Sequence, residues 1–293
     1  RGGVFLATDG FIDEFGENRV IDTPLAESSI AGIALGAAMN GMRPIAEIEF
    51  ADFIWPTINQ LVGEAARVRY GTNGKLGVPL VVRTPYGGGV RGGLYHSQSP
   101  EAYFAHTPGL KVVLPATPYD AKGLLKAAIR SEDPVVFLEN ELVYGRSFDV
   151  PKLDDYVLPI GKARIMKPGK DVTLVSYSIG VGVALEAAET LAGEGIDAEV
   201  IDLRTLRPLD TDTVLESLKK TNRIVVVEEG WPTCSIASEI AAVVMEKGFD
   251  DLDAPVLRVT NEDVPLPYAA NLEKAALIDA ARVVEAAKKV CYK

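Results

Sequence analysis

The chain has 293 residues, 47% of them hydrophobic and 24% charged, so it can bury a large core and is not a disordered protein. Its 41 acidic and 30 basic residues give a net charge of −11, which argues against nucleic acid or an anionic membrane surface as a partner. No uninterrupted run of about 18 apolar residues occurs, so no membrane span is predicted. The sequence begins at Arg1 and shows no signal-peptide pattern, which is compatible with a missing N-terminal segment.

Cysteine and histidine are both scarce. The two cysteines, Cys234 and Cys291, are too few for a disulfide scaffold, which favours a reducing compartment. The two histidines, His96 and His106, exclude a metal site built from several histidines.

Short β-branched runs alternate with longer helix-like stretches along the chain. Several runs are continuously apolar, as expected for parallel strands buried on both faces, and the alternation predicts an α/β fold with mostly parallel sheets. Strands are predicted at Ile45–Phe50, Leu80–Thr84, Lys111–Leu114, Val135–Glu139, Val172–Ser176, Ala198–Asp202, Ile224–Glu228 and Val256–Val259. Helices are predicted at Pro24–Asn40, Ile54–Val68, Pro118–Arg130, Val181–Glu194, Asp212–Lys219, Ile236–Lys247 and Ala276–Lys289.

A segment rich in proline, glycine and charge interrupts this alternation between about Leu142 and Lys170. Clear alternation resumes at Asp171. We therefore expect one domain at 1–150, a linker at 151–170 and a second domain at 171–293.

Glycines mark the predicted helices in two ways. Gly41, Gly195 and Gly248 stand where C′ glycines would end three helices. Gly32 and Gly36 lie inside the first helix, where each costs roughly 1 kcal/mol relative to alanine. Close approach of another backbone would compensate, either within the chain or at a subunit interface.

The first candidate site is the segment from Asp22 to Glu27. Thr23 is predicted to cap a helix with Pro24 in its first turn, which places Glu27 near the helix N-terminus. One interpretation is an acid that complements the helix dipole. The other is a carboxyl kept protonated by an apolar pocket, which exchanges a proton with a ligand. The dipole opposes the second interpretation, so burial would have to outweigh it.

The second candidate site follows a predicted strand that ends at Thr84. A glycine-rich loop, Gly87 to Gly93, leads to His96, just before a helix that starts near Pro100. Ligands of α/β sheets bind at the carboxyl ends of strands, although this loop is neither a Walker nor a dinucleotide-binding motif. His96 is therefore either a structural imidazole or a functional one, and its loop favours function. His106 is predicted to lie near a helix C-terminus in a structural role.

The third candidate is Glu47 to Trp55, where aromatic side chains stand at a strand-to-helix junction. Such aromatics either belong to the core or wall a planar ligand. The sequence also lacks the Gly-Asp-Gly loop with a downstream Asn that binds metal and diphosphate in thiamine enzymes. The chain is therefore predicted to bind only part of such a cofactor.

Four segments of the sequence are informative together: Ile21–Glu27, Phe50–Phe53, Tyr95–Ala102 and Glu199–Pro208. They resemble one family, the beta subunit of the thiamine diphosphate-dependent decarboxylase component of 2-oxo acid dehydrogenase complexes. The resemblance runs from Gly2 to the C-terminus. The part up to about Leu138 is most similar to branched-chain and broad-specificity members. The part from Glu139 onward is similar to pyruvate dehydrogenase, and Pro232–Glu239 also resembles acetoin dehydrogenase.

The resemblance implies a transketolase-like pyrimidine-binding domain followed by a domain of the transketolase C-terminal type. It implies an α₂β₂ heterotetramer in which an alpha subunit holds the diphosphate and Mg²⁺ of thiamine diphosphate. The implied reaction is oxidative decarboxylation of pyruvate, with acetyl transfer to a lipoyl domain of an acyltransferase that also carries a subunit-binding domain. Branched-chain 2-oxo acids and acetoin are alternative substrates, and a noncatalytic pairing subunit is the alternative of another class. The compartment would be the cytoplasm in bacteria or the mitochondrial matrix in eukaryotes.

The resemblance also implies roles for individual residues. Glu27 would donate a hydrogen bond to the aminopyrimidine ring nitrogen and so promote the imino tautomer that acts as a base. Leu25 and Phe53 would line the aminopyrimidine pocket. Glu49 stands where branched-chain relatives have Gln, and a second carboxyl there would favour protonation of Glu27. His96 would lie at the channel mouth and handle substrate or the lipoyl group.

A potassium site is implied at Ala128, Ser131 and Asp133, although relatives usually have Asp where Ser131 stands.

Overall fold

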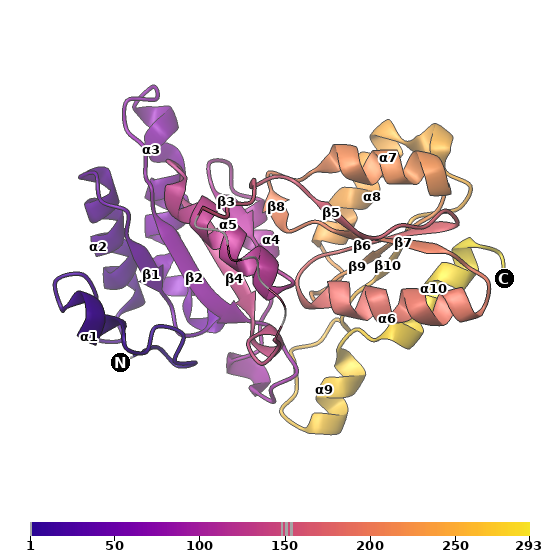
Figure 1. Cartoon of the computed structure of the whole chain (residues 1–293), viewed down its shortest axis with the longest axis horizontal. Helices are drawn as coiled ribbons and strands as arrows, with labels where there is room; N and C mark the ends of the chain where they lie inside the picture. The colour runs from indigo at the N-terminus through magenta and orange to yellow at the C-terminus, as the bar shows by residue number, and fades with distance from the viewer. Residues whose placement is uncertain (1, 148, 150–151, 153–154) are drawn as a thin grey trace.

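The computed structural model describes residues 2–147, 149, 152 and 155–293 and shows two α/β lobes side by side (Figure 1). The sheet of the N-terminal lobe has the order β1 (Ile45–Glu47), β2 (Val81–Tyr86), β4 (Val135–Asn140), β3 (Lys111–Val113) and β8 (Thr205–Arg207). The sheet of the C-terminal lobe has the order β10 (Leu257–Val259), β9 (Ile224–Val227), β6 (Val172–Ser176), β7 (Ala198–Asp202) and β5 (Arg164–Lys167).

All strand pairs are parallel except β3–β8 and β5–β7, so the predicted α/β fold with mostly parallel sheets is confirmed. The helices are α1 (Phe11–Phe15), α2 (Glu27–Met39), α3 (Ala66–Gly71), α4 (Glu101–Ala105), α5 (Pro118–Arg130), α6 (Ile179–Gly193), α7 (Thr211–Thr221), α8 (Ile236–Lys247), α9 (Ala270–Ala276) and α10 (Ala280–Val290). No helix in the described part of the chain is long and apolar enough to cross a membrane.

The two lobes are joined by more than the segment between them. β8 comes from the part of the chain expected to form the second domain, yet it pairs with β3 in the sheet of the N-terminal lobe. One hydrophobic cluster also runs across the seam between the lobes, from Leu138 on one side to Val175 and Tyr177 on the other. Burial of this shared core resists separation of the lobes.

Some helix ends follow the local sequence, and others depart from the prediction. Thr117 caps α5 by accepting from the Asp120 N–H at 3.1 Å, and the predicted span is confirmed at both ends. The predicted cap at Thr23 is wrong, because α2 begins at Glu27 with Ala26 at the cap position and no side-chain hydrogen bond. The predicted helix Ala276–Lys289 is two helices, because Asp279 caps α10 separately.

The predicted helix Ile54–Val68 is also wrong as a single regular element. The chain there forms a 3₁₀ turn at Trp55–Thr57, a π-helix at Asn59–Ala65 and then α3. Pro56 in the first turn has no N–H to donate, which suits a helix start rather than an interior.

Two of the three predicted C′ glycines are confirmed. Gly41 and Gly195 take left-handed backbones, with φ of 89° and 77°. Gly248 has φ of −132°, so that prediction is wrong. A Cβ at Gly248 would lie 2.8 Å from the Leu218 side chain, so close packing of α7 explains the glycine. In α2, Gly36 has nothing within 4 Å of a Cβ, so packing within the chain does not explain it.

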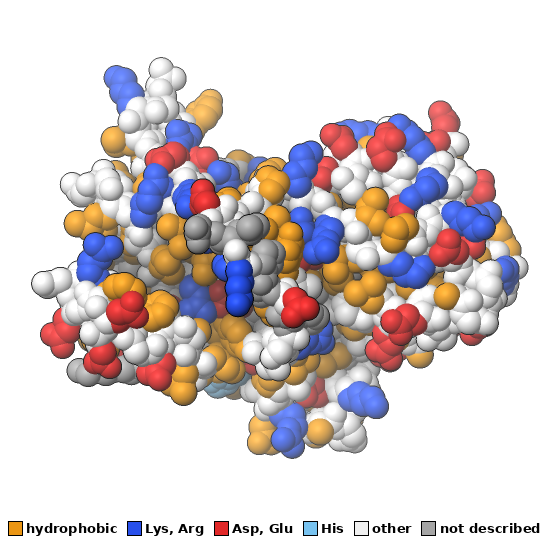
Figure 2. Space-filling view, in the orientation of Figure 1, with side chains coloured by type: hydrophobic (Ala, Val, Ile, Leu, Met, Phe, Trp, Pro, Cys, Tyr) orange, Lys and Arg blue, Asp and Glu red, His pale blue; other side chains and the backbone are white. Residues whose placement is uncertain are grey.

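Charge is unevenly distributed over the surface. Figure 2 shows acidic side chains gathered over α1 and the start of the chain, whereas both signs are mixed over the C-terminal lobe. The acidic region borders the pocket described next.

Candidate functional site

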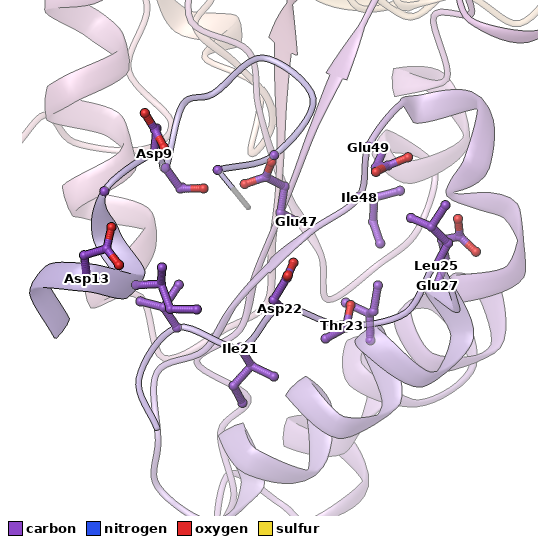
Figure 3. A pocket seen from close by; sticks show the side chains of 17 residues that line it. Asp9, Asp13, Ile21, Asp22, Thr23, Leu25, Glu27, Glu47, Ile48 and Glu49 are labelled. Carbon is purple, nitrogen blue, oxygen red and sulfur yellow. The ribbon is translucent and has the colours of Figure 1, made fainter. Parts of the chain in front are cut away.

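A pocket of about 210 Å³ lies where the first residues of the chain cover the end of β1 and the start of α2 (Figure 3). The carboxyl end of a parallel strand and a helix N-terminus meet here, which is the usual place for a ligand in an α/β fold. Its described lining contains no Lys, Arg or His. The lining contains six carboxylates: Asp9, Asp13, Asp22, Glu27, Glu47 and Glu49.

The pocket brings together three of the residues predicted from the sequence. Leu25, Glu27 and Glu49 lie on the same side of it in Figure 3. Glu27 is the first residue of α2 and is half-buried. Leu25 is 71% exposed, so this apolar side chain is available to cover a ligand or a partner. Ile48, which is buried, supplies an apolar wall between these side chains.

The cationic side chain that pairs with the lining residue Glu47 is already neutralised. Arg83 on β2 is buried and bonds to Glu139 on β4, with its Nε 2.9 Å from Oε1 and its Nη2 2.5 Å from Oε2. Its Nη1 also lies 2.6 Å from Glu47 Oε2. Burial raises the pKa of the Glu47 carboxyl above its usual value, although Arg83 opposes this shift. The pocket therefore keeps its acidic character.

His96 and Phe53 do not line this pocket but form a neighbouring aromatic cluster. The centroid of the His96 ring lies 4.8 Å from that of Phe50 and 5.3 Å from that of Phe53. The imidazole plane is nearly perpendicular to both phenyl rings. Phe50 also contacts Phe5 at 5.7 Å, so the segment that closes the pocket touches the cluster. His96 is half-buried at the end of the glycine-rich loop, as its position in the sequence predicted.

The C-terminal lobe holds the glycine-rich loop through two glutamates. The Gly88 N–H donates to Glu229 Oε1 at 2.8 Å. The Gly89 and Arg91 N–H groups donate to Glu273 Oε1 at 3.0 and 3.1 Å. Sequence reasoning assigned neither glutamate to this loop. Glu229 follows the buried strand β9 at its carboxyl end, which is the signal that could have found it.

Known proteins match the chain over its whole length. Residues 1–146 match the transketolase pyrimidine binding domain, and residues 161–283 match the transketolase C-terminal domain. The chain is 53% identical over 291 residues to the 2-oxoisovalerate dehydrogenase subunit beta of Bacillus subtilis, covering 99% of this chain and 89% of that protein. The chain belongs to the family of 2-oxo acid dehydrogenase beta subunits. Both the family and the two-domain fold inferred from the sequence are thereby confirmed.

A second relative is the pyruvate dehydrogenase E1 component subunit beta of Rhizobium meliloti, which is 55% identical over 291 residues. That match covers 99% of this chain, and the chain spans 63% of the length of the Rhizobium protein. The fold is also similar to a solved structure described as a split gene transketolase, inactive beta4 tetramer, with a TM-score of 0.81 and 26% identity. That match covers 98% of this chain and 88% of the other.

In this beta-subunit fold, buried carboxyls gather at the seam between the lobes. Burial raises the pKa of Glu101 from its ordinary 4.5 to about 8, and the nearby Glu228 adds to the shift. The Tyr177 hydroxyl donates to Glu101 Oε1 at 2.8 Å. Burial also raises the pKa of Glu229 to about 8, against the hydrogen bond from Gly88. Near neutral pH these carboxyls are therefore largely protonated.

We expect Glu101→Gln to flatten the pH dependence of thermal stability between about pH 5 and 8. The folded Glu101 keeps its proton through this range while the unfolded one releases it, so its contribution to stability is full below pH 4.5 and falls as pH rises towards 8. Glutamine cannot titrate and still accepts from Tyr177. Melting temperatures across this range measure the effect, with the exposed Glu246→Gln as control. Equal slopes for wild type and Glu101→Gln would contradict the assignment.

The residues of the implied potassium site do not fit a potassium ion. The Ala128 carbonyl accepts from the Ser131 N–H at 3.1 Å. Ser131 Oγ accepts from Lys111 Nζ at 2.8 Å, and Asp133 pairs with Arg69 and with Lys111 at 3.3 Å. Two cationic side chains thus already bond to the side-chain oxygens of Ser131 and Asp133. Among the residues that the structure describes, no group of three or more His, Cys, Asp or Glu is arranged to hold a metal.

Proposed function

We propose that the chain is the catalytic beta subunit of a pyruvate dehydrogenase-type decarboxylase and binds the aminopyrimidine half of thiamine diphosphate. The observation that carries this proposal is the pocket with six carboxylates and no cationic side chain in its described lining. Such a lining suits a cationic ring system and disfavours a diphosphate, which calls for positive charge, backbone N–H groups or a metal. The diphosphate and its Mg²⁺ would then be held by an alpha subunit in an α₂β₂ assembly.

When bound, thiamine diphosphate supplies a carbon nucleophile and an electron sink for decarboxylation of a 2-oxo acid. Glu27 would hold a proton at the pyrimidine ring nitrogen, because it stands half-buried in the pocket beside the apolar Leu25 and Ile48. Glu49 would favour that proton by placing a second carboxyl nearby. Leu25 would cover the ring and exclude water from it. Phe53 would not touch the ring from this pocket and would instead contact His96.

His96 would act at the next stage, the transfer of the acyl group to a lipoyl domain. It stands on a loop held from the C-terminal lobe and packed on Phe50 and Phe53, so its imidazole is presented from a fixed base. An imidazole can donate or accept a proton near neutral pH, which this transfer requires. The acyltransferase would supply both the lipoyl domain and a subunit-binding domain. The assembly would work in a bacterial cytoplasm or in a mitochondrial matrix.

We assign pyruvate as the substrate because of the 55% identity to a pyruvate dehydrogenase beta subunit. The 53% identity to a 2-oxoisovalerate dehydrogenase beta subunit supports branched-chain 2-oxo acids as the alternative, and acetoin is a third candidate. Reconstitution with an alpha subunit that carries a Gly-Asp-Gly loop, followed by a screen of all three substrate classes, tests this choice. A preference for a branched-chain acid or acetoin would overturn it.

A noncatalytic pairing subunit is the candidate of another class. It is supported by the similarity to a split gene transketolase whose structure is described as an inactive beta4 tetramer. A pairing subunit has no need for the acidic pocket. It predicts that substitutions in the pocket leave the turnover of the assembled enzyme unchanged.

We expect the isolated, folded chain to bind thiamine diphosphate and Mg²⁺ weakly or not at all. The described pocket lining offers the diphosphate no cationic group, and six carboxylates repel it. Titration calorimetry with thiamine diphosphate and Mg²⁺ measures this. Thiamine without phosphates is the matched control, because it lacks the repelled group. A dissociation constant of about 1 μM or tighter for the diphosphate would contradict the division of the site between two subunits.

A further inference from the structure

Asp52 is the middle residue of the 3₁₀ turn Ala51–Phe53, which follows β1 and has Phe50 at its N-cap. Its Oδ2 accepts a hydrogen bond from the Gln98 N–H at 3.2 Å. Burial raises the pKa of this carboxyl, while hydrogen bonds from the Gln98 and Ser97 backbones and the nearby His96 oppose the shift. Asp52 is therefore hydrogen-bonded to Gln98, which lies two residues after His96.

Other residues also pack against the turn that contains His96. The Phe50 and Phe53 rings hold the imidazole nearly perpendicular to both. A Cβ at Gly92 would lie 2.5 Å from the His96 carbonyl oxygen, so the glycine-rich loop folds tightly against the backbone of this turn. Ser97, the next residue, is buried. Asp52 is the acidic group among these contacts.

The second oxygen of Asp52 is free of hydrogen bonds. Oδ1 is buried and has no partner among the described residues. A buried acceptor without a partner is costly, and a functional role is one of the explanations for such a group.

We propose that Asp52 is a positioning residue for His96: it anchors the turn after His96 and so fixes the imidazole between Phe50 and Phe53. This inference rests on the proposed role of His96 in transfer to a lipoyl domain. A misplaced acid–base group loses rate in the step it serves and not in the others. Asp52 is therefore a determinant of lipoyl transfer, although it contributes nothing to the pocket lining.

The test uses the assembled complex with its alpha subunit and a lipoyl domain. Two assays are compared: decarboxylation read with an artificial oxidant, and acyl transfer to the lipoyl domain. We expect Asp52→Ala to lower transfer by up to about 10²-fold, the loss typical of a catalytic group displaced by about 1 Å. Decarboxylation should stay close to wild type. Asp250→Ala, an exposed aspartate in the C-terminal lobe, is the matched control.

Two further variants separate positioning from a structural role. The double variant Asp52→Ala with His96→Ala should be no worse than His96→Ala alone, because Asp52 acts only through His96. Asp52→Asn should retain most of the transfer rate, because its amide oxygen still accepts the Gln98 N–H. If Asp52→Ala does not assemble, Asp52→Ser repeats the test, since its shorter side chain cannot reach Gln98.

Additive losses, equal losses in both assays, or no loss in transfer would overturn the positioning role. If His96→Ala leaves transfer unchanged, the proposed role of His96 fails instead. The two failures are therefore distinguishable.

Discussion

Glu27→Gln is expected to lower the turnover of the assembled enzyme by about 10²- to 10⁴-fold, the usual contribution of general acid–base catalysis. Glutamine keeps the shape of the side chain and its place at the start of α2, but it cannot release or regain a proton. The described pocket lining has no Lys, Arg or His, so proton exchange in this pocket falls to its carboxyls, and Glu27 is the one that stands at the start of α2 beside Leu25 and Ile48. The position of the proton in the bound ring then depends on this carboxyl.

Turnover with an artificial oxidant and sedimentation of the complex measure this prediction together. The complex should assemble normally, because glutamine has nearly the same size as glutamate and fits the first position of α2. Glu14→Gln, the same chemical change on the exposed α1, is the control and should keep full activity. More than about a tenth of wild-type turnover in Glu27→Gln would contradict the role of Glu27, since a loss of about 10-fold is ten times smaller than the smallest expected loss.

The sequence identified the parts of the site that follow from strand and helix ends. Glu27 and Glu49 flank the ends of a helix and a strand that the apolar pattern predicts, so their proximity is a consequence of α/β topology. The wall made by Asp9 and Asp13 was missed, because the segment that carries them has no periodic pattern and packs against β1 only through tertiary contacts. A local sequence pattern does not indicate that a distant segment packs over the pocket.

The missed strands have the same cause. β5 and β8 are short, and each pairs antiparallel with a strand that is predictable on its own. β8 joins the other lobe, so nothing in its own three residues indicates its partner. The hydrogen bonds from the Gly89 and Arg91 N–H groups to Glu273 join residues more than 180 positions apart in sequence. They could not be predicted for the same reason.

The seam between the lobes connects these observations to function. Strand order in the C-terminal sheet changes direction between β9 and β6, which is where ligands of such sheets bind. Here the glycine-rich loop of the other lobe approaches that edge, and Glu229 holds Gly88 there. The edge of the C-terminal sheet where a ligand would usually bind thus fixes the loop that carries His96. This edge lies outside the acidic pocket.

His96→Ala is expected to lower acyl transfer to a lipoyl domain by about 10²-fold or more while decarboxylation changes little. The imidazole is set on Phe50 and Phe53, apart from the pocket that Glu27 and Glu49 line. Under the proposed function, loss of the imidazole removes the proton carrier of the transfer step without altering the acidic pocket.

The artificial-oxidant assay reads decarboxylation without lipoamide, and the full complex reads both steps, so the two assays should diverge for this variant. His106→Ala is the matched control, because His106 is exposed at the end of α4 and makes no contact with the Phe50–Phe53 cluster among the ring contacts of the described residues. Equal losses in both assays would place His96 in the substrate step. No loss in either assay would make it a structural residue, held by the aromatic rings for packing alone.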